Sequence, residues 1–278
     1  MIKAVSDSLV ELARNYSALT VFNADFSKEW GLTRFAEYYG EKLYTLGLSE
    51  GNIASVVSGF ALRGKMPFVF LPVEKCYEQI RNSICVPNLN VKIVGIGGLG
   101  LGEEGVGRQS LEDVALMRAL PNMKVYCPCD YDEAMECMKL AAAEYGPCYI
   151  RLAFVEGKVG GGVGVEVLKK GSDVCVFVMG GMVGEVLKAA ELSEKSVKVV
   201  KVSVLKPIDS AAILECAGDL KCFSVEDHSV IGGLGDAVMG CGLIVKKLGM
   251  EGFGESGKAR DLRRKFGLHA EGIAERLA

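Results

Sequence analysis

The chain has 278 residues, half of them hydrophobic, with 32 Lys and Arg against 35 Asp and Glu and a mean hydropathy of +0.26. This composition excludes disordered and fibrous chains, and the length fits about two domains. The nearly balanced charge gives no electrostatic reason to expect nucleic acid or a membrane as a partner. No apolar run reaches the roughly 18 charge-free residues of a membrane span, and the N-terminus lacks the apolar stretch of a secretory signal, so we expect neither.

The first half of the chain alternates between two patterns. Short apolar runs bounded by turn residues are typical of buried strands, and they occupy residues 18–23, 67–71, 91–95, 124–127 and 148–152. Longer amphipathic stretches between them favour helices at residues 52–63, 76–84, 111–118 and 133–145. Buried strands that alternate with helices indicate a parallel sheet covered by helices on both faces.

A glycine-rich stretch over residues 156–164 interrupts this alternation and is typical of a linker or a surface crossing. After it, strands are expected at residues 173–179, 197–202 and 221–225. Helices are expected at residues 183–192, 210–217 and 235–247. The sequence therefore predicts an α/β protein with two consecutive parallel-sheet domains, each sheet with helices on both faces, over residues 1–155 and 165–278.

Ten cysteines and two histidines bear on metal binding and on the cellular compartment. No two cysteines have CxxC spacing, so we expect no structural zinc and no other metal ligands in this chain. Cysteines scattered over apolar positions are typical of small buried hydrophobic residues in a reducing compartment. We therefore expect a cytoplasmic protein.

The segment from Gly95 to Gly107 contains a GxGxxG pattern directly after an expected strand. A dinucleotide site needs a helix to start inside that pattern, so that free amides and the helix dipole face a pyrophosphate. Here the glycines continue past Glu103 and Glu104, and the next helical pattern begins only near Leu111. We therefore favour a long, tightly folded loop at the carboxyl edge of the sheet, where open α/β sheets bind ligands. A glycine-rich connection without a role is the alternative.

Few titratable residues stand out as candidate site residues. Glu50 precedes an expected helix, where a carboxylate is usually a cap or a partner of the helix dipole. His228 is one of only two histidines, and a lone histidine is more often structural than catalytic. The side chains of Arg108 and Arg151 are equally suited to bind an anion and to lie solvated at the surface. The residues alone therefore predict a two-domain α/β protein with a ligand-binding edge, and no particular reaction.

Longer motifs resemble the C-terminal half of transketolase over almost the whole chain. Residues 47–53 (GLSEGNI) resemble the family's "GIAEQNM" element, and residues 77–84 (YEQIRNSI) resemble its "YDQIRNSI" helix. Further matching motifs lie at residues 23–28, 102–113, 117–123, 205–209, 225–235 and 253–257. The resemblance implies a pyrimidine-binding domain followed by the transketolase C-terminal domain.

Members of this family are enzymes that use thiamine diphosphate to move a two-carbon ketol unit between sugar phosphates. The resemblance implies that Glu50 activates the cofactor, because it would hydrogen-bond N1′ of the aminopyrimidine and exchange a proton with it. It also implies that Asp25 and Phe70 contact the cofactor. The substrate contacts that it implies are Arg108, Gln109 and Arg151.

The family's "GDG…N" domain, which binds magnesium and the diphosphate, has no counterpart in this sequence. The resemblance therefore implies a split enzyme in which this chain is the C-terminal subunit and has no activity alone. An N-terminal transketolase-like subunit would supply the magnesium and diphosphate site. The resemblance further implies a homodimer or an α2β2 assembly.

Two departures from the family pattern leave alternatives open. The aromatic "TFAxF" segment, which packs on the aminopyrimidine, is shortened here to residues 68–76, where Phe70 would substitute. The histidine of the family's "THQ" motif is replaced by Arg108, which cannot relay a proton but can bind a phosphate or carboxylate. One alternative is a non-catalytic or regulatory subunit. The other is a related deoxyxylulose-phosphate synthase or 2-oxoacid dehydrogenase β-type subunit.

Overall fold

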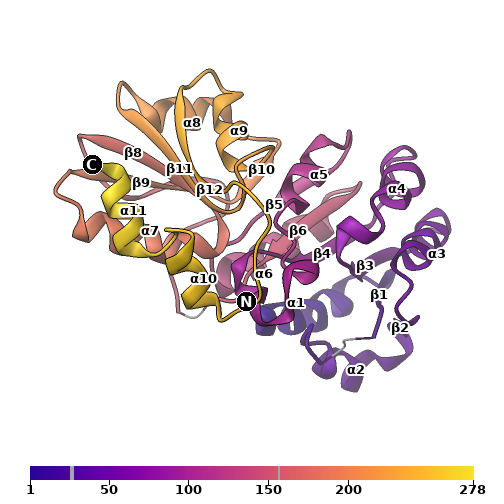
Figure 1. Cartoon of the computed structure of the whole chain (residues 1–278). Helices are drawn as coiled ribbons and strands as arrows, with labels where there is room; N and C mark the ends of the chain where they lie inside the picture. Colours follow the sequence, from indigo (N-terminus) through magenta and orange to yellow (C-terminus); the bar gives the residue numbers. More distant parts are fainter. Residues whose placement is uncertain (26–27, 156) are drawn as a thin grey trace.

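The structure is a computed structural model and describes residues 1–25, 28–155 and 157–278. Two sheets lie side by side in it (Figure 1). From edge to edge, the seven-stranded sheet contains β10 (Val204–Lys206), β5 (Lys124–Tyr126), β6 (Cys148–Leu152), β4 (Lys92–Ile96), β3 (Met66–Phe70), β1 (Leu19–Asn23) and β2 (Leu43–Thr45). The five-stranded sheet contains β12 (Val245–Met250), β11 (Lys221–Ser229), β8 (Val174–Val178), β9 (Val197–Val202) and β7 (Val165–Lys169). The predicted α/β class with two consecutive sheets is confirmed, while the domain limits stay a prediction.

Helices cover both faces of the first sheet (Figure 1). Its strands β1, β3 and β6 are buried along their whole length, as apolar runs in a parallel sheet must be. One face packs against α1 (Ile2–Asn15), α2 (Thr33–Tyr39) and α6 (Tyr131–Ala143). The other packs against α3 (Glu50–Leu62), α4 (Tyr77–Gln79) with the π-helical turn Ile80–Cys85, and α5 (Asp113–Ala119).

The second sheet shares a core with the first. α7 (Val183–Leu192) and α11 (Ala270–Leu277) pack on its outer face. On its inner face, α8 (Ser210–Ala217) and α9 (Leu234–Met239) join the apolar cluster that also holds α3 and α5. α10 (Ala259–Lys265) packs on a loop of the first domain. Short 3-10 turns complete the chain at Gly40–Lys42, Val73–Lys75, Leu99–Glu104, Val106–Arg108 and Gly180–Met182.

Each sheet ends in an antiparallel edge strand that the sequence patterns did not predict. β10 comes from the second half of the chain but pairs with β5 of the first sheet, with Val204 opposite Tyr126. Lys206 fixes this crossing, because its Nζ donates to the carbonyls of Arg118 (2.9 Å) and Leu120. In the second sheet, β7 runs antiparallel to β9. Both sheets are therefore parallel except at one edge.

Two helices differ from the sequence expectation. The predicted helix 235–247 is wrong beyond Met239, because α9 ends there and the chain continues as β12. Gly242, with a φ of +101°, lies in the turn between them, in a conformation that favours glycine. The amphipathic helix α1 is an element that the sequence reasoning missed, and its buried face packs against α6.

The glycine-rich connection between the sheets is held against the protein. Its first residue, Glu156, lies outside the described residues. Asp130 accepts hydrogen bonds from the amides of Val159 (2.8 Å) and Gly160 (3.0 Å), and the buried Lys201 donates to the Gly162 carbonyl (2.8 Å). The connection therefore crosses the surface and is held by hydrogen bonds at two places, to Asp130 and to Lys201. Among the described residues, none of the helices combines the length and apolar character of a membrane span.

Candidate active site at the carboxyl edge of the first sheet

Most of the residues singled out from the sequence lie in segments that follow strands of the first sheet, at one edge of that sheet. β2, β1, β3, β4 and β6 are parallel neighbours, so their carboxyl ends lie along the same side. Glu50 follows β2, Asp25 follows β1, and Arg108 and Gln109 lie in the loop after β4. This is the edge at which open α/β sheets bind ligands. The structure therefore supports the predicted location of a binding edge.

Glu50 is the first residue of α3, where its carboxylate faces the positive end of the helix dipole. Its side chain is only 13% exposed, and Oε1 accepts a hydrogen bond from Nζ of Lys75 at 3.3 Å. Gly51 permits the close approach of α4, since a Cβ there would lie 3.3 Å from Oε1 of Gln79. Glu50 is thus a sheltered carboxylate whose partner, Lys75, is half exposed.

The two other predicted cofactor contacts lie in different surroundings. Asp25 is exposed directly after β1, and the next two residues of its motif, Phe26 and Ser27, lie outside the described residues. Phe70 is only 1% exposed and packs on Trp30, with 5.4 Å between the ring centroids. It faces α1 and α6, on the side of the sheet opposite to α3. Phe70 therefore does not lie beside Glu50 in this chain.

The glycine-rich segment after β4 folds as the two 3-10 turns Leu99–Glu104 and Val106–Arg108 and not as the start of a long helix. Its glycines permit close packing against charged side chains. A Cβ at Gly97 would lie 2.7 Å from Nε of Arg151, and one at Gly98, where φ is +93°, would lie 2.0 Å from Asp227. The segment is therefore the tightly folded loop that we favoured from the sequence.

Two cavities open along the edge and share Pro72 as a wall. One, of about 230 Å³, lies between Lys75 and Phe253 of the second domain. The other, of about 180 Å³, is lined by Arg108 and Trp30 among others. Arg108 is half-buried in this wall, so its predicted contact with a substrate fits its placement and stays a prediction.

Gln109 is fully buried and joins the two domains. Its Nε2 donates to the carbonyl of Glu255 at 2.7 Å, and its own carbonyl accepts from the amide of Gly98 at 2.8 Å. A Cβ at Gly254 would collide with its Oε1, so glycine is required for this approach. Gln109 thus positions the loop that carries Arg108.

Arg151 lies in the interior between the domains, where its side chain is 1% exposed. Its Nε donates to Asp113 at 2.9 Å, and its Nη1 donates to Asp227 at 3.0 Å. Nη2 donates to the Asp227 carbonyl at 3.2 Å. The hydroxyl of Tyr149 completes the cluster by donating a hydrogen bond of 2.6 Å to the Asp113 carboxylate. The guanidinium is enclosed by protein carboxylates, so this placement does not support the predicted contact of Arg151 with substrate.

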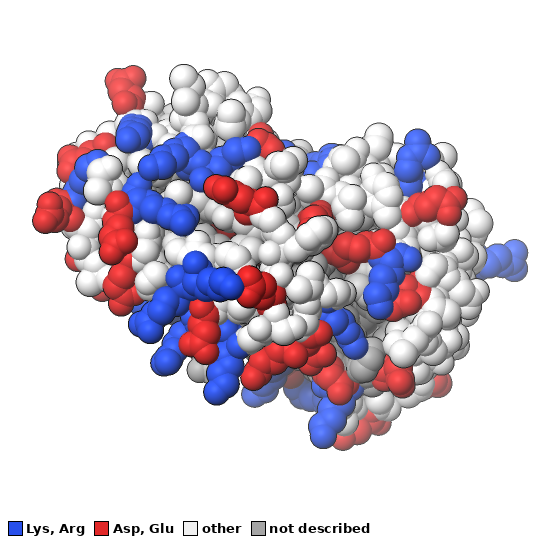
Figure 2. All heavy atoms as spheres, in the orientation of Figure 1, with Lys and Arg blue, Asp and Glu red and all other residues white. Residues whose placement is uncertain are grey.

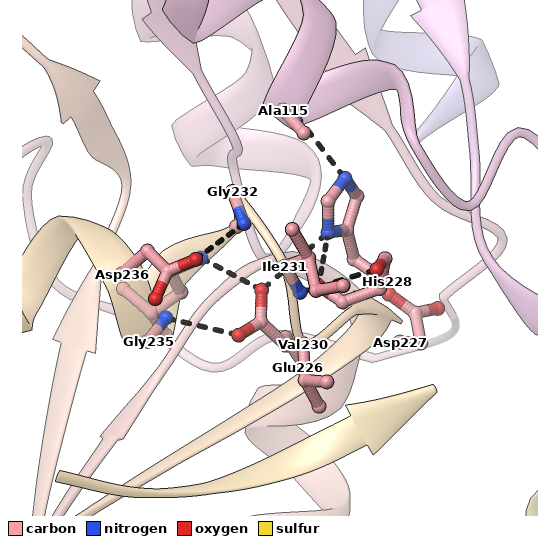
Figure 3. A network of polar contacts seen from close by, with 12 residues as sticks. Ala115, Glu226, Asp227, His228, Val230, Ile231, Gly232, Gly235 and Asp236 are labelled. Carbon is pink, nitrogen blue, oxygen red and sulfur yellow. Dashed lines mark hydrogen bonds and ion pairs between the residues drawn. The ribbon is translucent and has the colours of Figure 1, made fainter. Parts of the chain in front are cut away.

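His228 and Glu226 lie in a buried network of polar contacts (Figure 3), which adjoins this cluster because Nε2 of His228 lies 3.9 Å from Asp113. Glu226 accepts hydrogen bonds from the amides of Leu234 (2.7 Å) and Gly235 (2.9 Å) at the start of α9, and burial raises the pKa of its carboxyl to about 7. His228 bonds the Ser229 carbonyl through Nδ1 (2.7 Å) and accepts from the Ala115 amide at Nε2 (3.3 Å), while burial lowers its pKa. Both ring nitrogens are thus satisfied, as expected for a structural histidine.

Three residues of the edge escaped the sequence reasoning. They are Lys75, Trp30 and Phe154. For Lys75 a signal existed, because it stands in the segment that replaces the family's aromatic residues. Surface charge gives no such signal, since Lys and Arg are interspersed with Asp and Glu over both domains on the face seen in Figure 2. Trp30 and Phe154 could therefore be found only from the geometry.

Comparison with known proteins matches this chain along its length. The model of the transketolase pyrimidine binding domain matches residues 1–153, and that of the transketolase C-terminal domain matches residues 164–273. A transketolase C-terminal section from Methanocaldococcus jannaschii is 33% identical over 304 residues, which cover 100% of this chain and 95% of the relative. A 6-deoxy-6-sulfo-D-fructose transketolase subunit from Clostridium sp. (strain MSTE9) is 33% identical over 298 residues, covering 96% and 90%.

A solved structure of a split gene transketolase, an inactive β4 tetramer, has the same arrangement of elements. Its TM-score is 0.84 at 34% sequence identity, and the match covers 98% of this chain and 95% of that one. The two domain models, the long relatives and the shared fold therefore agree. The chain belongs to the transketolase family and corresponds to its C-terminal half.

Proposed function

We propose that this chain is the C-terminal subunit of a transketolase-type transferase, which moves a two-carbon ketol unit between sugar phosphates with thiamine diphosphate. The observation that carries the proposal is the position of Glu50, a sheltered carboxylate at the first residue of α3 on the ligand-binding edge. The split gene transketolase of the same fold supports a two-subunit arrangement. The cytoplasm is the proposed location, in keeping with ten free cysteines, most of them buried.

The residues present fit one half of a thiamine diphosphate site. Glu50 supplies a carboxylate for the aminopyrimidine, and the exposed Asp25 on the neighbouring strand is proposed as a second contact. The predicted aromatic surface is not formed by Phe70, which is buried on the other face of the sheet. Within residues 1–25, 28–155 and 157–278, no cluster of His, Cys, Asp or Glu is arranged to hold a metal ion. We therefore assign magnesium and the diphosphate to an N-terminal partner subunit.

Glu50 has a defined task in this proposal. Thiamine diphosphate supplies the electron sink that lets a carbon–carbon bond break and form again. Glu50 would hold a proton at N1′ of the aminopyrimidine and exchange it, as a positioned acid does in general acid–base catalysis. For this, its contact with Lys75 must open. An ion pair with a half-exposed lysine contributes only about 0–1 kcal/mol, so the contact opens easily.

The remaining site residues take different roles. Arg108, in the wall of the smaller cavity, is proposed to contact the substrate. Gln109 holds the loop of Arg108 against the second domain and so positions it. The assembly that we propose is a homodimer of this chain or an α2β2 complex with the N-terminal subunit.

A second candidate function is a non-catalytic subunit. The burial of Phe70 and Arg151 favours it, because both side chains are withdrawn from the roles that an active family member would need. This candidate shares the fold and the partner but predicts no turnover.

Reconstitution tests the proposal. The chain is mixed with an N-terminal subunit that carries the "GDG…N" domain, with thiamine diphosphate and Mg²⁺, and ketol transfer between sugar phosphates is assayed. We expect transfer only when both subunits are present. Transfer by this chain alone would contradict the split-subunit assignment. An assembled complex that binds the cofactor but transfers nothing would favour the non-catalytic candidate.

A further inference from the structure

The smaller cavity of the candidate active site has walls that are mostly apolar. Its volume is about 180 Å³, and its apolar walls are Trp30, Pro72, Ile96, Leu101 and Phe154. They lie at or after the ends of β1, β3, β4 and β6, so the cavity lies over the carboxyl edge of the sheet. Trp30, Ile96 and Leu101 are half-buried, and Phe154 remains 47% exposed. The walls therefore offer apolar surface to a molecule entering from solvent.

The charged residues around this cavity argue against a phosphate. Glu29 and Glu104 line it and are exposed, which places them toward solvent, while Arg108 is half-buried. Two carboxylates against one guanidinium repel a dianionic group. A sugar hydroxyl that leaves water for the apolar part of the walls, away from Glu29, Glu104 and Arg108, forms no new hydrogen bond and is disfavoured.

An apolar group has the opposite preference. Its transfer from water to such walls is favourable in proportion to the area buried. An apolar cavity of about 150 Å³ is large enough to bind benzene, so the volume of this one suffices for a phenyl ring or a branched aliphatic group. The lining of the cavity lies at or after the ends of β1, β3, β4 and β6, whereas Glu50 follows β2 of the same sheet. The cavity and Glu50 therefore belong to the same carboxyl edge.

We propose that this cavity binds the apolar side chain of a neutral aldehyde that accepts the ketol unit. This inference rests on the proposed function. The C2–C3 bond of the donor ketose breaks, and its C3 hydroxyl loses a proton as C3 becomes the aldehyde of a product two carbons shorter. A new bond joins the ketol carbonyl carbon to the acceptor's aldehyde carbon, whose oxygen takes up one proton. No oxidant or reductant is needed.

Trp30 makes the cavity directly observable, because it is the only tryptophan of the chain. The full chain is titrated with 3-methylbutan-1-ol and with benzyl alcohol, unreactive analogues of the aldehydes, while Trp30 fluorescence is recorded. We expect a saturable change with both alcohols and a weaker one with erythritol, whose hydroxyl groups find no partners on the apolar walls. An absent response, or an equal response to erythritol, would overturn the proposal.

Two variants locate the response in the cavity. Leu101→Asn places an amide in its wall, and we expect binding to weaken about tenfold. Leu192→Asn is the control, since Leu192 is 57% exposed at the end of α7. Phe154→Ser repeats the test at a residue already 47% exposed, so it guards against a folding defect of Leu101→Asn. Equal binding by all three variants and the unmodified chain would contradict the assignment.

The reconstituted complex then separates this inference from the proposed function. We expect kcat/KM for 3-methylbutanal relative to erythrose 4-phosphate to fall about tenfold in Phe154→Ser. Leu192→Asn, outside the site, should leave this ratio unchanged. Transfer to erythrose 4-phosphate but not to 3-methylbutanal would overturn the inference alone. A saturable Trp30 response in a complex that transfers to no acceptor would contradict the proposed function and uphold the apolar ligand class.

Discussion

Two regions of this molecule hold charged residues of the same types in opposite surroundings. At the carboxyl edge of the first sheet, Glu50 pairs with a lysine that is half exposed. Between the domains, Arg151 pairs with Asp113 and Asp227, and all three side chains are at most 1% exposed. Glu50 is accessible enough to exchange its partner for a ligand, whereas the interior groups are enclosed by protein.

This difference has an energetic side. An exposed ion pair contributes about 0–1 kcal/mol, so its partners separate readily. Removing one partner of a buried pair leaves an uncompensated charge and is strongly destabilising. Access therefore distinguishes a candidate catalytic carboxylate from a structural one, and residue type does not.

The largest expected effect lies in the interior pair. Arg151→Met leaves the carboxylates of Asp113 and Asp227 without their cation, so the free energy of unfolding should fall by about 3–5 kcal/mol. Urea denaturation measures it. The matched control is Arg81→Met, at an exposed arginine, which should change stability by less than about 0.5 kcal/mol. Similar losses in both variants would remove the contrast between the two regions.

The pH dependence of Glu226 sharpens the comparison. Burial raises the pKa of its carboxyl from 4.5 to about 7, so the buried acid is neutral where the unfolded chain would ionise it. Its contribution to stability is therefore complete below about pH 4.5 and is lost as the pH rises through about 7. Between these limits the unmodified chain should lose about 3 kcal/mol relative to Glu226→Gln.

Unfolding at a series of pH values measures this difference. His228, whose lowered pKa makes stability rise with pH, is present in both proteins, so its contribution cancels in the comparison. The control is Glu41→Gln, at an exposed residue, whose profile should run parallel to that of the unmodified chain. A Glu226→Gln profile that is also parallel would contradict the assignment of the shifted pKa.

The smallest effect is expected at the edge. Lys75→Gln removes the partner of Glu50, but the lysine is half exposed, so stability should change by less than about 1 kcal/mol. Urea denaturation of Lys75→Gln and Arg151→Met, measured side by side, compares their losses in the free energy of unfolding. A loss as large as that of Arg151→Met would make the Glu50–Lys75 pair structural.

Much of the fold could be predicted because the buried strands are short apolar runs in the sequence. β6, for example, was expected at the five residues where the structure has it. β10 could not be predicted, because its pairing with β5 depends on a chain crossing that no local pattern encodes. The false helix after Met239 has a similar cause, since residues 245–250 are apolar enough for either element and the sheet decides between them.

The candidate site divides in the same way. Glu50 could be found from the motif around it and from its place before a helix. The burial of Arg151 could not, since its two carboxylate partners lie 38 and 76 residues away in the sequence. The orientation of Phe70 depends on the period of two of a strand, and its neighbour Val69 faces the α3 side instead.

The central claim is that Glu50 activates the cofactor, and exchange of the C2 proton of thiamine diphosphate tests it most directly. In the reconstituted complex, Glu50→Gln keeps the size of the side chain and removes its acidic proton. The account predicts that the complex still assembles and that exchange, followed by NMR, slows by about 10²–10⁴. Glu271→Gln, in the first turn of α11, should exchange at the normal rate. Near-normal exchange in Glu50→Gln would contradict the account and leave Glu50 as a helix-terminal carboxylate.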